Sequence, residues 1–350
     1  MTGQSWSVIY INGPTKTNSK MNPHLLLLFR CKRKNQNGLA IFILALFTVV
    51  FCYGQTPTDA LMMPSKNICV LLSYDYGHFD RYWEGDNLRR NETIATVNRT
   101  TVLPMAAIGI LDELNLYVGL PYVKTKSSEP NGGKFEGEKG FQDFMIALKY
   151  KALEKSIGSG RLSLFSTVGY ATPATNYLSD YMPYSLGFGA PEFSLRGIAQ
   201  YQFSNGFYVR GMAGHLWRGY TEAERDYYYN DGSYYTALMD VPNAWNFEAV
   251  LGKWFLNNAL KLELNYTGLK STSGDNIRAY NAAQPTNKVQ FDRLGVSLQY
   301  YSPSLKGLGI VGYYTNVVNG LNTAKISNVG LGLTYQFNFI KNTNNEEDAQ

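Results

Sequence analysis

The chain has 350 residues, with 32 Lys and Arg, 27 Asp and Glu, and a formal net charge of +5. Residues 1–54 hold six of the basic residues and no acidic one, so 26 basic and 27 acidic residues remain after them. Because the basic excess belongs to this first stretch, it predicts no nucleic-acid partner. The 27 Tyr and 18 Phe residues favour strands over helices.

The first 54 residues have the pattern of an export signal. A basic stretch precedes an apolar run over residues 39–51, and Cys52-Tyr53-Gly54 fits a cleavage site. The run is shorter than the ~20 residues that a membrane-spanning helix needs. We therefore predict a leader over residues 1–54 with a signal peptide, and Met21 is an alternative start. An uncleaved anchor is the competing interpretation.

The rest of the chain shows an alternation of apolar and polar residues with period two. Over residues 329–339, Val, Leu, Tyr and Phe fill the odd positions, whereas Gly, Thr, Gln and Asn fill the even ones. In a strand this pattern gives one apolar face and one polar face. Alternation and turn signals together predict about twelve strands. They are expected near residues 68–78, 94–110, 114–125, 141–154, 161–172, 192–203, 207–219, 244–256, 259–270, 289–301, 308–318 and 327–339.

The connections between these strands alternate between short and long. The short ones lie near residues 111–113, 155–160, 204–206, 257–258 and 303–307. The long ones lie near residues 79–93, 126–140, 173–191, 220–243 and 271–288, and the last outer connection, 319–326, is short. Short periplasmic turns and long external loops are typical of an outer-membrane barrel. The three-residue loop 204–206 also predicts that Tyr201 pairs with Val209.

We therefore predict an all-β fold, a transmembrane antiparallel up-and-down β-barrel of about 12 strands in the bacterial outer membrane. A closed barrel pairs all backbone groups internally, as lipid requires. The barrel is expected over residues 68–339, with a periplasmic N-terminal segment at 55–67 and a polar tail at 340–350. The expected partners are outer-membrane lipid, a small-molecule solute and, because the last strand ends in an aromatic residue, the barrel-assembly machinery.

Charged residues on the polar faces are the candidates for lining the lumen. They are Asp143, Lys149, Lys151, Arg196, Arg210, Glu248, Lys261, Glu263, Asp292 and Arg293. Their mixed signs argue against a strongly ion-selective pore. Two interpretations stay open, because these residues either line a transport path or pair across strands and fill a narrow lumen. No metal-ligand spacing occurs, so no metal and no cofactor are expected.

Two histidines, His78 and His215, follow the predicted leader. A hydrolase would need one of them beside a serine or cysteine and an orienting acid. Since His215 shares its segment with Trp217 and falls on the apolar face, we expect it at the barrel rim. No catalytic residue is predicted, and the chain is not expected to be an enzyme.

Three stretches resemble a known family. Residues 108–125 contain a tight turn, a strand and Leu120-Pro121-Tyr122; residues 140–150 run from Gly through Asp143 to Lys149-Tyr150; and Gly169-Tyr-Ala-Thr-Pro173 follows. This pattern is similar to that of the transporters of the MetA-pathway of phenol degradation. The resemblance spans roughly residues 95–340 and implies an outer-membrane channel for small, often aromatic or hydrophobic compounds.

The sequence therefore favours an outer-membrane channel or transporter for small molecules, including hydrophobic or aromatic ones. A non-conducting structural or adhesive barrel that binds through the Tyr-rich loop 220–243 is the first alternative. An outer-membrane lipid enzyme, with a serine or an acid beside His78 or His215, is the second.

Overall fold

The computed structural model describes residues 56–277 and 283–339. The predicted leader with its cleavage site and the predicted polar tail lie outside the described residues. The elements of the described residues are all strands, and none of these residues belongs to a helix long and apolar enough to cross a membrane. The all-β prediction is therefore confirmed.

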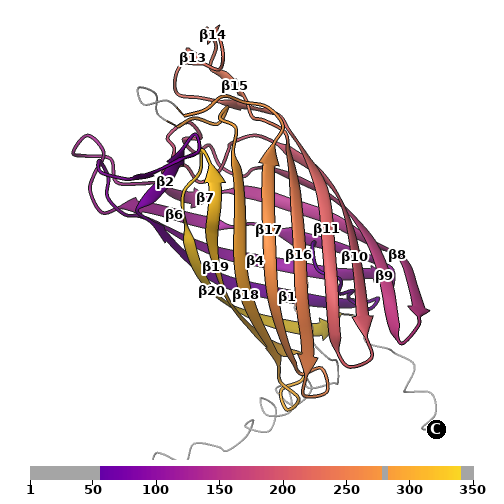
Figure 1. Cartoon of the computed structure of the whole chain (residues 1–350). Helices are drawn as coiled ribbons and strands as arrows, with labels where there is room; N and C mark the ends of the chain where they lie inside the picture. Colours follow the sequence, from indigo (N-terminus) through magenta and orange to yellow (C-terminus); the bar gives the residue numbers. More distant parts are fainter. Residues whose placement is uncertain (1–55, 278–282, 340–350) are drawn as a thin grey trace, which may run out of the picture. The chain divides into compact units, whose positions relative to one another are not determined.

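Twelve antiparallel strands close into a barrel (Figure 1). One wall strand is divided into two pieces, and another is preceded by a short extra piece. The wall consists of β1 (Asn67–Phe79), β4 (Val97–Leu111), β5 (Leu114–Gly119) with β6 (Tyr122–Ser127), β7 (Lys139–Phe141) with β8 (Asp143–Ile157), β9 (Gly160–Pro173), β10 (Glu192–Phe203), β11 (Phe207–Arg218), β16 (Ala244–Phe255), β17 (Leu260–Ser271), β18 (Gln290–Tyr301), β19 (Leu308–Leu321) and β20 (Ser327–Asn338).

The first strand closes the barrel. β1 pairs with β20 along one edge and with β4 along the other, so the sheet has no open edge there. Closure satisfies the backbone N–H and C=O groups that hydrocarbon could not solvate. The observed bounds follow the predicted ones closely, because each strand is marked locally by its alternation and its flanking turns.

The predicted hairpin register is also observed. Tyr201 on β10 faces Val209 on β11, and the Gly206 N–H donates to the Phe203 carbonyl at 3.1 Å. Gly206 has φ of +84°, a left-handed conformation that glycine adopts without steric cost. The turn thereby keeps the apolar residues of both strands on one face.

The two faces of the wall differ in the way the alternation predicts. On β20, Leu331 and Leu333 are exposed on the outside, whereas Gly332 and Thr334 are buried inside. The same alternation gives outward Leu262 and Leu264 on β17. An apolar exterior is what a membrane-spanning barrel presents to lipid.

The long connections carry short hairpins at the end of the barrel opposite the short turns (Figure 1). They are β2 (Arg81–Glu84) with β3 (Asn87–Arg90), β12 (Tyr220–Glu222) with β15 (Leu238–Asp240), and β13 (Tyr228–Tyr229) with β14 (Ser233–Tyr234). We refer to this end as external and to the end with short turns as periplasmic.

Candidate functional site

The inner face of the barrel gathers most of the charged residues that the sequence singled out. By the strand alternation, all of them lie on the inward side except Asp292. The inward ones are Asp143, Lys149 and Lys151 on β8, Arg196 on β10, Arg210 on β11, Glu248 on β16, Lys261 and Glu263 on β17, and Arg293 on β18. The contacts that each of these side chains makes decide which of them form the candidate site.

Asp292 does not line the lumen, so that prediction is wrong. Its carboxylate accepts hydrogen bonds from the Tyr266 hydroxyl at 2.6 Å and from the Asn319 side chain at 2.9 Å, on the outward side. Adjacent residues of a strand face opposite sides, so Asp292 and Arg293 could not both point inward. A register shift against β19 falls between these two residues.

A buried ion-pair network occupies the wall formed by β11, β16 and β17. The Arg210 guanidinium lies 2.6 Å from the Glu248 carboxylate and 3.0 Å from the Glu263 carboxylate. Lys261 lies 3.4 Å from Glu263, which also accepts a hydrogen bond from the Tyr208 hydroxyl at 2.6 Å. Because each buried charge has a partner, the network fixes this wall without leaving a bare acid.

Lys149 binds a segment that precedes the first strand. Its ammonium donates to the Thr56 carbonyl at 2.8 Å and the Asp59 carbonyl at 3.1 Å, and pairs with the Asp59 carboxylate at 2.9 Å. The Lys149 side chain is 0% exposed. The Thr167 hydroxyl adds a hydrogen bond to the Pro57 carbonyl at 2.9 Å. Residues 56–59 are therefore attached to the inner faces of β8 and β9.

Apolar residues continue this attachment over residues 60–64. Ala60 and Met62 pack against a cluster of inward side chains on β9, β10 and β11, which are Phe165, Ile198 and Met212. Leu61 and Met63 pack into a second inner cluster that includes Tyr117 and Trp254. The sequence predicted a periplasmic N-terminal segment over residues 55–67, but residues 56–63 lie against the inner face of the barrel, whereas Ser65 bonds to Asp112 in a short turn. We call residues 56–64 the lumenal segment.

A cavity of about 480 Å³ lies inside the barrel next to the lumenal segment. Thr56 and Pro57 form part of its boundary. One wall is polar and includes Arg210, Glu248, Glu263, Asn265 and Arg293. Other parts of the lining are apolar and include Leu71, Leu103, Met105, Met145 and Val311. The cavity can therefore contact a solute that has both a polar and an apolar part.

The loop over residues 174–191 folds onto inward side chains near the external end. Arg99 on β4 donates to the Ser185 carbonyl at 3.2 Å and to the Leu186 carbonyl. The Tyr177 hydroxyl donates to the Asp143 carboxylate at 2.7 Å. Burial raises the pKa of Tyr177, so its hydroxyl keeps the proton that this bond needs. Asp143 thus anchors the loop.

The remaining predicted lumen residues make fewer contacts. Lys151 lies 3.5 Å from Glu154 on its own strand, and Arg196 donates to the Ser194 hydroxyl at 2.7 Å. Arg293 forms no ion pair or hydrogen bond with any residue that the structure describes. Most of the predicted lumen residues thus form ion pairs, Asp143 binds the loop over residues 174–191, and Arg196 and Arg293 form no ion pair among the described residues.

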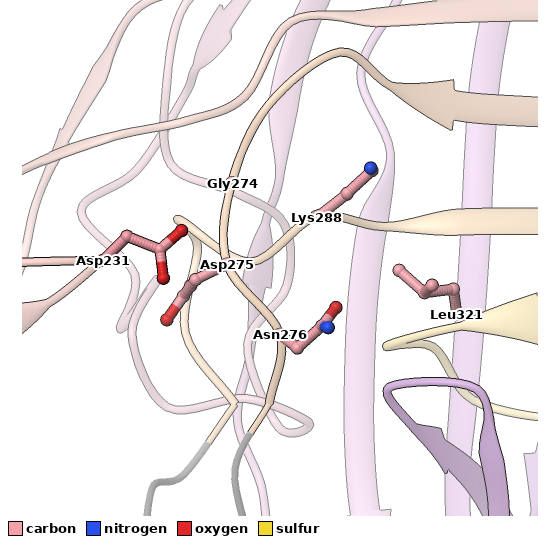
Figure 2. Close-up of a pocket in the computed structure, with 6 residues that line it drawn as sticks. All are labelled: Asp231, Gly274, Asp275, Asn276, Lys288 and Leu321. Atoms are coloured by element: carbon pink, nitrogen blue, oxygen red, sulfur yellow. The ribbon is translucent and has the colours of Figure 1, made fainter.

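A second recess, of about 330 Å³, lies among the external loops (Figure 2). Asp231, Asp275, Asn276 and Lys288 line it, together with Gly274 and Leu321. The Asp275 carboxylate accepts a hydrogen bond from the Asn287 side chain at 2.8 Å. Within the described ranges, no group of three His, Cys, Asp or Glu residues could hold a metal ion. The lumenal cavity is the larger of these two spaces.

The histidines give the enzyme hypothesis no support. His215 faces outward, with its ring 4.4 Å from the Trp217 ring and 4.7 Å from the Trp245 ring, as a rim residue would. His78 is the cross-strand neighbour of Ser327. The Ser327 hydroxyl, however, accepts a hydrogen bond from the Asn316 amide at 2.6 Å. An activated nucleophile needs a hydrogen bond to its base, and none joins Ser327 to His78.

Comparison with solved structures supports the fold. An outer membrane channel from Pseudomonas putida F1 matches with a TM-score of 0.63 and 11% identity, over 81% of this chain and 100% of that one. The KdgM porin matches with a TM-score of 0.36 and 10% identity, over 76% and 99% of the chains. OccK8 (OprE) from Pseudomonas aeruginosa matches with a TM-score of 0.34 and 10% identity, over 78% of this chain and 98% of that one. Only the first similarity is strong enough to bear on the fold.

No curated protein matches the chain. One protein family does match it directly in sequence. The sequence model of the family described as putative MetA-pathway of phenol degradation covers residues 84–304, which run from the end of β2 to the turn after β18. That range includes every predicted lumen residue. The chain therefore belongs to the family of the putative MetA-pathway of phenol degradation.

Proposed function

We propose that the protein is an outer-membrane channel that carries small solutes through the lumen of its barrel. The observation that carries this proposal is the internal cavity of about 480 Å³ within a closed wall whose exterior is apolar. Passage along such a lumen requires no catalytic group, only a path and suitable lining residues. The last strand, β20, is followed by the exposed aromatic Phe339, which supports recognition by the barrel-assembly machinery.

The lumenal segment is the gate of this channel. It is bound to the wall by the Lys149–Asp59 ion pair, by a few hydrogen bonds and by apolar contacts, but it forms no strand of the wall. Moving it would therefore leave the pairing of the barrel strands unchanged. Solutes pass when the segment leaves its position beside the cavity.

The solutes are small molecules with an aromatic or otherwise apolar part. The family is named for phenol degradation, and the similar structure from Pseudomonas putida F1 is described as an outer membrane channel. The mixed apolar and polar lining of the cavity supports the same class of solute.

One observation favours a second candidate function, adhesion through the external loops. Tyr235 has 85% of its surface exposed, and Tyr220, Tyr227 and Tyr234 are exposed in the same loop. Exposed aromatic side chains in one loop are a common feature of binding surfaces. A barrel of this kind would bind a partner without conducting.

Single-channel recording of the refolded barrel in planar bilayers tests the channel. We expect the unmodified chain to conduct weakly or intermittently and Lys149→Gln to conduct more, because the substitution removes the charge that holds Asp59. Lys151→Gln is the matched control, since Lys151 lies on the same face of β8 and forms an ion pair with Glu154, which is not part of the lumenal segment. Small aromatic solutes should block the current.

A folded Lys149→Gln barrel that never conducts, and that still does not conduct when residues 56–64 are deleted, would refute the channel. Loss of partner binding after replacement of Tyr234 and Tyr235 would then support the adhesive barrel.

A further inference from the structure

Arg293 differs from Lys149, Arg210 and Lys261 in having no acidic partner among the described residues. Lys149, Arg210 and Lys261 each lie within 3.4 Å of a carboxylate. Arg293 lies in no ion pair among the described residues, and its Nε is buried without a hydrogen-bond partner. Its guanidinium carbon is 5.7 Å from the Phe291 ring. Arg293 is partly buried, and a guanidinium stays charged, so leaving it without a partner costs free energy.

The nearby acids do not supply the missing partner. Asp75 and Glu248 act on Arg293 electrostatically, but neither lies within ion-pair distance of it. Glu248 instead pairs with Arg210 at 2.6 Å. Glu263 is shared by Arg210 and Lys261. The carboxylates of the cavity wall are thus committed to other cations.

The position of Arg293 connects this charge to the cavity. Arg293 lines the same space of about 480 Å³ as the apolar side chains Leu71, Leu103 and Val311. Val311 comes from β19, which pairs with β18, and Leu71 and Leu103 come from β1 and β4, which lie beyond β20 around the wall. An apolar cavity of about 150 Å³ is enough for a single benzene ring, so this space accommodates one ring with a polar substituent.

We propose that Arg293 and this apolar lining form a binding subsite for small organic anions. The anionic group, a carboxylate in the simplest case, accepts hydrogen bonds from the Arg293 guanidinium, which can bind both of its oxygens. The aromatic or aliphatic part of the solute lies against Leu71, Leu103 and Val311. This inference rests on the proposed channel function for its biological meaning, but the binding itself does not depend on conduction.

Calorimetric titration of the refolded full-length chain tests the subsite with three probes that share one ring. They are benzoate, benzyl alcohol and benzylammonium. We expect benzoate to bind about tenfold or more tightly than benzyl alcohol, as hydrogen bonds to a charged group allow, and benzylammonium to bind most weakly. Arg293→Gln should remove the preference for benzoate and leave the affinity for benzyl alcohol nearly unchanged.

Arg196→Gln is the matched control, because Arg196 is also an inward arginine without an acidic partner among the described residues, yet it does not line the cavity. Its preference for benzoate should match that of the unmodified chain. Arg293→Lys keeps the charge but loses the two-point geometry, so it should retain a reduced preference for benzoate. This variant therefore separates the effect of the positive charge on benzoate binding from the effect of the guanidinium geometry.

Equal affinity of the unmodified chain for the three probes would overturn the subsite, as would a benzoate preference that survives Arg293→Gln. Conductance without any preference for benzoate would leave the channel standing and remove the subsite. Arg293-dependent binding of benzoate by a barrel that never conducts would keep the subsite and remove the channel.

Discussion

Lys149 shows how one buried charge can hold a separate segment of the chain inside the barrel. Its alternation with Tyr150 places it inside the barrel, where a bare ammonium would be unstable. The partner that neutralises it, Asp59, comes from the lumenal segment, 90 residues earlier in the chain. The need to pair one buried charge therefore attaches a separate piece of chain to the wall.

Glu138 makes the docking of the loop over residues 174–191 depend on pH. Its carboxylate accepts a hydrogen bond from the Leu178 N–H at 2.9 Å, and burial raises its pKa above the usual 4.5 despite that bond. The docked loop thus binds a proton more tightly than the free loop does. Docking is strongest below the ordinary pKa of a glutamate and weakens as pH rises through the raised value.

The amide protection of Leu178 in hydrogen exchange, corrected for the intrinsic rate, should therefore increase when the pH is lowered. Glu138→Gln should remove this pH dependence. Glu136→Gln serves as the control, because Glu136 is half exposed and pairs with Lys126 at 3.1 Å. Unchanged pH dependence in Glu138→Gln would show that another group controls the docking.

At the scale of elements, the lumenal segment depends on a close approach to β4. A side chain at Gly109 would meet the Pro64 carbonyl oxygen at 2.0 Å from its Cβ atom. Gly109 lies on β4 where the register against β5 shifts, and its carbonyl accepts a hydrogen bond from the Lys66 N–H at 2.9 Å. The absence of a side chain at this position makes room for the chain to turn into the lumen.

Gly109→Val should consequently displace the lumenal segment and leave the barrel intact, because valine fits a strand but not the space that Pro64 occupies. We expect faster protease cleavage within residues 56–66 and a higher conductance than in the unmodified chain. Gly211→Val is the control, since nothing lies near the side-chain position of Gly211. Equal cleavage of the two variants would argue against a docked segment.

At the scale of the whole molecule, the wall separates lipid from lumen over the thickness of a single sheet. Leu264 and Asn265 are neighbours on β17, yet Leu264 is exposed outside and Asn265 lines the cavity. The same substitution therefore places a side chain in lipid at Leu264 and in the lumenal cavity at Asn265.

Leu264→Lys should destabilise the refolded barrel by about 2–4 kcal/mol if it lies at the bilayer midplane, because a charge then faces hydrocarbon. Asn265→Lys should cost much less, since its ammonium enters a polar cavity. Urea titrations of refolding into lipid vesicles measure both values. A smaller cost for Leu264→Lys than for Asn265→Lys would contradict the assignment of the faces.

The sequence by itself determined the strands, their order and which face of the wall most side chains occupy. These features are local, because alternation and turn residues act within a few positions, and the predicted hairpin of Tyr201 with Val209 was observed for that reason. Alternation also identified the inward residues, apart from Asp292, which cannot share a face with its neighbour Arg293.

Only the tertiary structure decided which of these residues meet. The apolar run of residues 60–63 was the available sign that the N-terminal segment is not a plain linker, but it has no periodicity that indicates a partner. Lys149 pairs with Asp59, and Arg293 has no acidic partner among the described residues, because closing the barrel brings together residues that lie far apart in sequence. Pairing across the lumen depends on that closure, and no local pattern contains it.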